Sequence, residues 1–103
     1  FAGMHAVHTN NNLCLIVFGL KLAEGDLMRG LSQTVAMGLD SDCTAASAGS
    51  ILGAVLGKSA IAPELYECFH DRMDTYLKNT EAFSIRDMAK RYSALAHKVH
   101  SRL

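Results

Sequence analysis

The sequence has few cysteines, no net charge and no long apolar run, and each of these absences excludes a class of protein. The three cysteines, Cys14, Cys43 and Cys68, are widely spaced and form no Cys-x-x-Cys pair, so neither a disulfide framework nor a zinc ribbon is indicated. Ten basic residues balance ten acidic ones, which gives no long-range attraction for nucleic acid or an acidic membrane. The most apolar run, residues 13–20, is shorter than the roughly 20 residues of a membrane span. We therefore expect a cytoplasmic protein without nucleic-acid or membrane partners.

The length of the chain limits it to one modest core. With 103 residues, half of them apolar and 19% charged, folding would bury about 60–70% of the unfolded surface. This predicts a single domain over residues 1–103. The sequence begins at Phe1, without an initiator methionine, and its first ten residues lack a signal-peptide pattern, which favours a processed chain or a fragment.

Five segments have the patterns of helices, and no segment alternates between apolar and polar residues as a half-buried strand does. The predicted helices cover residues 13–24, 27–37, 44–56, 63–78 and 85–103. Gly25 and Gly38 are stop signals, Asp26 is an N-cap, Pro63 suits a first helical position, and Ser84 begins a capping box. The apolar run 13–20 fits a buried strand as well as a helix, and its continuation to residue 24 favours the helix. The predicted fold class is all-α, a compact bundle of about five helices.

Two of these helices carry distinctive patterns. The helix at 44–56 and the residue after it place small residues four apart, at Ala45, Gly49, Gly53 and Gly57. Because each interior glycine costs about 1 kcal/mol relative to alanine, this stripe predicts the close approach of another backbone. The last helix gathers its apolar residues within an arc of about 120°, namely Ile85, Met88, Ala89, Tyr92, Leu95, Ala96, Val99 and Leu103.

Asp40 and Asp42 are the residues with the clearest chemical potential. Two positions apart in an extended loop, they can point both carboxylates to one side, an arrangement that gathers hard cations such as Mg²⁺ or Ca²⁺. A structural role is the alternative, in which Asp42 caps the helix that follows. The two roles are compatible.

The residues around this loop resemble a known signature. The loop Gly38-Leu39-Asp40-Ser41-Asp42-Cys43 and the small-residue helix after it resemble the metal loop and Ala-Gly-x-x-x-Gly helix of the ADP-ribosylglycohydrolase family. A segment that precedes this loop in one branch of the family is similar to Val7-His8-Thr9-Asn10-Asn11-Asn12, and an Ile-Pro element that follows it is similar to Ile61-Ala62-Pro63. The resemblance covers about residues 6–95, as the C-terminal portion of the larger helical fold.

The resemblance implies a mostly helical fold in which two Mg²⁺ ions position ADP-ribose, and hydrolysis of the bond between its terminal ribose and a modified side chain or other leaving group. Asp40 and Asp42 would be metal ligands, and His8, Asn11 and Gly38 would contact ADP-ribose or an ADP-ribosylated substrate. Cys43 stands where many members have a hydroxyl ligand, and a thiol is a poor ligand for Mg²⁺. The resemblance does not fix the linkage that is cleaved.

One part of the family pattern does not occur in this sequence. The family's remaining metal ligands include a Thr-Asp-Asp-type cluster, and these 103 residues contain none. Two carboxylates and water fall short of the six ordered oxygen ligands of Mg²⁺, so we expect weak or absent Mg²⁺ binding and little or no hydrolase activity from this chain alone. No catalytic residue is assigned. The alternative is a non-catalytic helical interaction module, a homo-oligomer that associates through residues 13–22 or the glycine face of residues 44–56.

Overall fold

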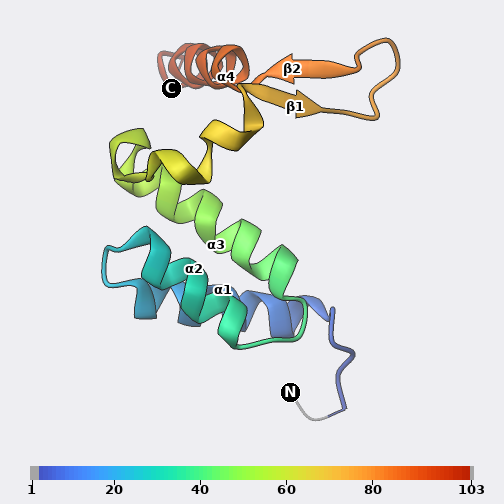
Figure 1. Ribbon diagram of the computed structural model, residues 1–103, viewed down its shortest axis with the longest axis vertical. Coiled ribbons are helices and arrows are strands. Elements are labelled where there is room, and N and C mark those ends of the chain that lie inside the picture. The colour runs from blue at the N-terminus through green and yellow to red at the C-terminus, as the bar shows by residue number, and fades with distance from the viewer. Residues whose placement is uncertain (1–2, 103) are drawn as a thin grey trace. The chain divides into compact units, whose positions relative to one another are not determined.

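The computed structural model describes residues 3–102, which are mostly helical and include one small sheet (Figure 1). In chain order the elements are α1 (Thr9–Ala23), α2 (Leu27–Ala36), α3 (Ser41–Leu56), the 3-10 helices η1 (Lys58–Ala60), η2 (Pro63–Leu65) and η3 (Glu67–Phe69), the strands β1 (Arg72–Asp74) and β2 (Ala82–Ser84), and α4 (Ile85–His100). The predicted mostly helical fold class is confirmed. Contacts divide the chain into two compact units, Phe1–Ile61 and Ala62–Leu103, and the single domain stays a prediction.

The first unit consists of α1, α2 and α3 packed against one another. Its core is small and formed by Leu15, Ala23, Leu27, Ala48 and Leu52. The buried positions of α1 recur every fourth residue and therefore form one stripe along the helix. Since α1 is apolar on several sides, other apolar side chains of this helix stay exposed: Leu13, Val17, Phe18 and Leu22.

The closest approaches at glycines of this unit occur in α1 and α2. A Cβ atom at Gly19 would collide with the hydroxyl of Thr34, and one at Gly30 would lie 2.5 Å from Leu52 Cδ1 and 2.8 Å from Ala23 Cβ. These two glycines therefore allow the helices to pack closely.

At Gly49 and Gly53, the small-residue stripe of α3 faces side chains and no other backbone among residues 3–102, so the predicted close approach of a backbone is wrong there. A Cβ atom at Gly49 would meet the side chain of Leu31 at 2.9 Å, and one at Gly53 would meet only the side chain of Ile61, at 3.8 Å. Gly57 lies beyond the helix, at its C-cap with a φ of 77°. The left-handed conformation of that residue explains its glycine, because a side chain there would be strained.

The helix predicted at residues 63–78 was also wrong. Two 3-10 turns occupy its first half, and β1 then pairs with β2 in an antiparallel hairpin with Met73 opposite Phe83. His70 and Asp71 both have left-handed backbone angles, with φ of 49° and 59°, which an α-helix cannot contain. The carboxylate of Asp71 bonds to residues of the β2–α4 junction, so distant contacts override a weak local periodicity.

The predicted last helix is confirmed over α4. Ser84 caps it as expected, because its hydroxyl accepts a hydrogen bond of 3.0 Å from the amide of Asp87. The apolar arc of this helix is exposed along its length, and only Met88 is half-buried among the arc residues that the structure describes. Leu103 lies outside the described residues. Within residues 3–102, no helix is long and apolar enough to cross a lipid bilayer.

Candidate metal site

The loop between α2 and α3 turns sharply before it reaches the two aspartates. Gly38 and Leu39 are consecutive residues in the left-handed region, with φ of 73° and 60°. Glycine adopts this conformation freely, whereas a bulky residue such as leucine rarely does. The turn places Asp40 directly before Ser41, where α3 begins.

Asp40, and not Asp42, occupies the N-cap position of α3, which corrects the predicted cap. The backbone carbonyl of Asp40 accepts the first helical bond, from the amide of Thr44 at 3.0 Å. Its carboxylate makes no capping bond to the helix and instead accepts a hydrogen bond of 2.5 Å from Asn12 Nδ2. Asp42 lies in the first turn, where the helix dipole favours its negative charge without a capping bond.

The structure brings Asp40, Asp42 and Cys43 together. One potential ligand atom from each of these side chains lies within 4.8 Å of the others. Asp40 is half-buried, and Asp42 and Cys43 are exposed. The group therefore presents two carboxylates and one thiol toward a common space at the N-terminus of α3.

Hydrogen bonding within the cluster shifts the pKa values of Asp40 and Cys43 in opposite directions. The hydrogen bond from Asn12 lowers the pKa of Asp40 most, and a further hydrogen bond from Cys43 adds to the effect. The same contact with Asp40, with the negative charges of Asp40 and Asp42, raises the pKa of the Cys43 thiol. At neutral pH Asp40 is thus a carboxylate and Cys43 a neutral thiol. Such a donor set suits a hard cation held by oxygen, and the thiol does not fit it.

A comparison with protein families identifies the same family that the sequence of this loop resembles. The ADP-ribosylglycohydrolase family profile matches residues 3–101, nearly the whole chain. The chain belongs to the ADP-ribosylglycohydrolase family. No curated protein and no solved structure matches it. Its family membership therefore rests on the profile and on the residues that carry the signature, the Asp40–Asp42 loop among them.

The three residues expected to contact ADP-ribose belong to two segments of this family member. His8 is exposed and caps α1, since its Nδ1 accepts a hydrogen bond of 3.1 Å from the amide of Asn10. Asn11 is 1% exposed, and its Nδ2 donates to the carbonyl of His5 at 3.1 Å. Gly38 lies in the loop before Asp40. Their role in substrate binding stays a prediction.

Sequence reasoning missed Asn12, which contacts the acidic loop directly. Asn12 follows Asn11 in a run of three asparagines, and nothing in that run distinguishes the asparagine that faces Asp40. The helix that begins at Thr9 decides this, because neighbouring residues of a helix point about 100° apart. Asn11 is therefore buried while Asn12, half-buried, reaches the loop.

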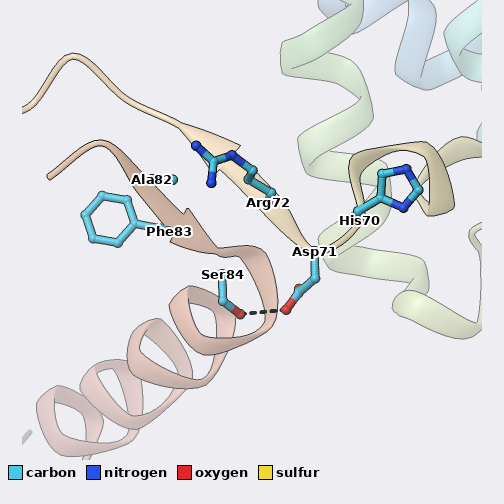
Figure 2. A pocket seen from close by; sticks show the side chains of 6 residues that line it. All are labelled: His70, Asp71, Arg72, Ala82, Phe83 and Ser84. Atoms are coloured by element: carbon cyan, nitrogen blue, oxygen red, sulfur yellow. Dashed lines mark hydrogen bonds between the residues drawn. The ribbon is translucent and has the colours of Figure 1, made fainter.

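A surface hollow lies in the other unit, beside the hairpin (Figure 2). Asp71 accepts hydrogen bonds there from the Ser84 hydroxyl at 2.7 Å and from the Arg86 amide at 2.9 Å. Both bonds lower the pKa of Asp71. His70 points away from the Asp71–Ser84 pair in Figure 2. The carboxylate thus ties the hairpin to the start of α4, which is a structural role.

Proposed function

We propose that this chain is an ADP-ribosylglycohydrolase-like protein whose Asp40–Asp42 loop contributes ligands to a Mg²⁺ site for ADP-ribose. The observation that carries the proposal is the cluster itself, in which carboxylate oxygens of Asp40 and Asp42 lie within 4.8 Å of each other. The lowered pKa of Asp40 keeps it charged, as a metal ligand must be. In the intact family the metal positions ADP-ribose for hydrolysis of the glycosidic bond.

The number of donors limits what this loop does by itself. Mg²⁺ takes six oxygen ligands in a near-octahedral array, and the loop supplies two carboxylates. The remaining positions would be filled by water or by groups that these 103 residues do not provide, such as the Thr-Asp-Asp-type cluster of the family. We therefore propose weak Mg²⁺ binding and little or no hydrolysis by this chain alone.

The same geometry supports a place for the substrate. Asn12 joins the first turn of α1 to the loop before α3, so His8 and Gly38 belong to the two segments that this bond connects. We propose that ADP-ribose contacts this junction through His8 and Gly38, and that the buried Asn11 acts through the turn that its side chain holds. The leaving group, whether a side chain or another glycoside, is not selected by these residues.

Calorimetry tests the metal site. The chain is titrated with Mg²⁺ and then with ADP-ribose, beside an Asp40→Ala/Asp42→Ala variant and a Glu64→Ala/Glu67→Ala control that removes two exposed acidic residues elsewhere. We expect a binding heat for the wild type and the control, and none for the loop variant. Equal heats for the wild type and the loop variant would contradict the proposal.

Exposed apolar surface favours a second proposal, in which the chain is a helical interaction module that forms homo-oligomers. Leu13, Val17 and Phe18 of α1 are each more than half exposed. On α4, Tyr92 and Leu95 are 67% and 56% exposed, although their helix has the pattern of a buried face.

Sedimentation velocity at micromolar concentration tests this association. We expect a dimer or larger species for the wild type and a shift toward monomer for Phe18→Glu or Leu95→Glu, which place a charge on either surface. Lys21→Glu is the control on α1. A monodisperse wild-type monomer opposes the proposal.

A further inference from the structure

We propose that Asn12 is a positioning residue for Asp40, whose side-chain amide fixes one carboxylate oxygen and leaves the other directed to a cation. The inference rests on the proposed function of the Asp40–Asp42 loop as a metal site. It adds a residue outside the loop, on a different helix, to the machinery of that site.

The first argument is the direction of the Asp40 side chain. An aspartate at an N-cap ordinarily turns its carboxylate to the free amides of its own helix. Asp40 occupies this position without a capping bond, and its Oδ2 instead accepts the 2.5 Å hydrogen bond from Asn12, 28 residues earlier in the chain. The carboxylate is thus held by α1 through Asn12, its largest hydrogen-bond partner, in addition to the contact with the Cys43 thiol at the start of α3.

The second argument is that, among the described contacts, the side-chain amide of Asn12 bonds to Asp40 alone. A carboxylate accepts but does not donate, so the Nδ2 group of Asn12 must be the one that faces Asp40. The Oδ1 atom of Asn12 is buried and has no hydrogen-bond partner. The described contacts of the side chain therefore orient it through Asp40 alone.

The third argument is that Asn12 is held on an ordered helical turn. The backbone amide of Asn12 donates to the carbonyl of His8 at 3.1 Å. The neighbouring side chain of Asn11 is buried and bonded to the carbonyl of His5. A metal ligand that is oriented by a fixed hydrogen-bond donor needs less reordering when it binds the metal. Losing such a donor typically costs about 10- to 100-fold in metal affinity.

Three ¹⁵N-labelled chains test this role: the wild type, Asn12→Ala and the matched control Asn10→Ala, an exposed asparagine of the same helical turn. Circular dichroism first checks that each chain folds. Mg²⁺ affinity is measured for all three and for Asp42→Ala, and the Asn12 side-chain amide resonance is followed in the wild type and in Asp40→Ala. The resonance needs no Asn12 variant, so the test stands even if Asn12→Ala does not fold.

We expect Mg²⁺ affinity to fall about 10- to 100-fold in Asn12→Ala and to stay at the wild-type value in Asn10→Ala. With saturating Mg²⁺, the Asn12 amide should keep the hydrogen-bonded position that Asp40→Ala abolishes. A resonance that moves with Mg²⁺ to its Asp40→Ala position overturns the inference, as does equal affinity for the two asparagine variants. Failure of this inference alone leaves the wild type able to bind Mg²⁺. If neither the wild type nor Asp42→Ala binds Mg²⁺, the proposed metal site itself has failed.

Discussion

Gly19 of α1 lies against Thr34 of α2 so closely that a Cβ atom at Gly19 would collide with the Thr34 hydroxyl. Thr34 has no exposed surface, and its hydroxyl donates a hydrogen bond of 2.7 Å to the carbonyl of Gly30. The hydroxyl cannot move away without losing this bond. The packing of α1 on α2 therefore depends on the missing side chain of Gly19.

Replacing Gly19 with alanine should destabilise the first unit. Overpacking of a filled core costs about 1–3 kcal/mol, which exceeds the roughly 0.5–1 kcal/mol that alanine gains over glycine inside a helix. Urea unfolding followed by circular dichroism measures the change. The cost should shrink when Thr34→Ala removes the colliding hydroxyl, and an unchanged cost in that background would show that the contact is not its source.

The opposite result is expected at Gly53 of α3. A Cβ atom there would meet only Ile61 Cδ1, at the ordinary contact distance of 3.8 Å. Gly53→Ala should therefore raise the free energy of unfolding by about 0.5–1 kcal/mol, because alanine restricts the unfolded chain. The same urea unfolding measures it, with Gly19→Ala as the paired variant. Destabilisation by Gly53→Ala would mean that something approaches α3 which the described contacts do not include.

Gly19 and Gly53 show which features of the fold can be predicted from local sequence and which cannot. The helices α1, α2, α3 and α4 were predictable because their apolar spacing and their caps, such as Ser84, act within a few residues. Which glycine meets a neighbouring helix depends on how helices pack, and a glycine stripe in one helix does not contain that information. Gly19 and Gly53 are both interior glycines of helices, and they differ in what surrounds them.

The same distinction between local and distant contacts applies to the candidate metal site and to the hairpin. The proximity of Asp40 and Asp42 could be predicted from sequence because the two residues lie two positions apart at the start of α3. Asn12 was not, because it reaches Asp40 from 28 residues away. The hairpin was mistaken for a helix since the bond that fixes it, from Ser84 to Asp71, also joins distant positions.

Ser84→Ala should loosen the second unit. The Ser84 hydroxyl accepts the amide of Asp87 at 3.0 Å and donates to Asp71 at 2.7 Å, so alanine removes both an N-cap and the tie to the hairpin. Loss of an N-cap alone costs about 0.5–2 kcal/mol. Amide hydrogen exchange in α4 should accelerate accordingly, whereas Ser93→Ala, on the exposed side of the same helix, should leave the first turn unchanged. Equal exchange in both variants would contradict the role of Ser84.

Asp71 should make the second unit sensitive to acid. Its hydrogen bond from Ser84, and then that from Arg86, lower its pKa below the ordinary value of 3.8. A lowered folded pKa stabilises the fold above pH 3.8, and this contribution is lost as pH falls through the folded pKa. Asp71→Asn should therefore destabilise α4 at neutral pH, with the difference from wild type shrinking below about pH 4. Hydrogen exchange of α4 across this range measures it, with Asp74→Asn, which pairs with exposed Arg72, as the control. A difference that stays constant down to pH 2 would contradict this assignment.

Cys43 should report the charge of the acidic loop through its reactivity. Its hydrogen bond to Asp40, the charge of Asp40 and then that of Asp42 raise its pKa, and the thiolate is the form that reacts with alkylating reagents. Asp40→Asn removes the charge and leaves only a neutral, weaker acceptor for the thiol, so the folded pKa should fall and the alkylation rate at about pH 8 should rise, roughly several-fold. Iodoacetamide labelling followed by mass spectrometry, in a chain with Cys14→Ser and Cys68→Ser, isolates the rate of Cys43. Asp42→Asn should give a smaller increase, because it removes a charge but not the hydrogen bond. A rate that does not change in Asp40→Asn would show that the thiol and this carboxylate do not interact in solution.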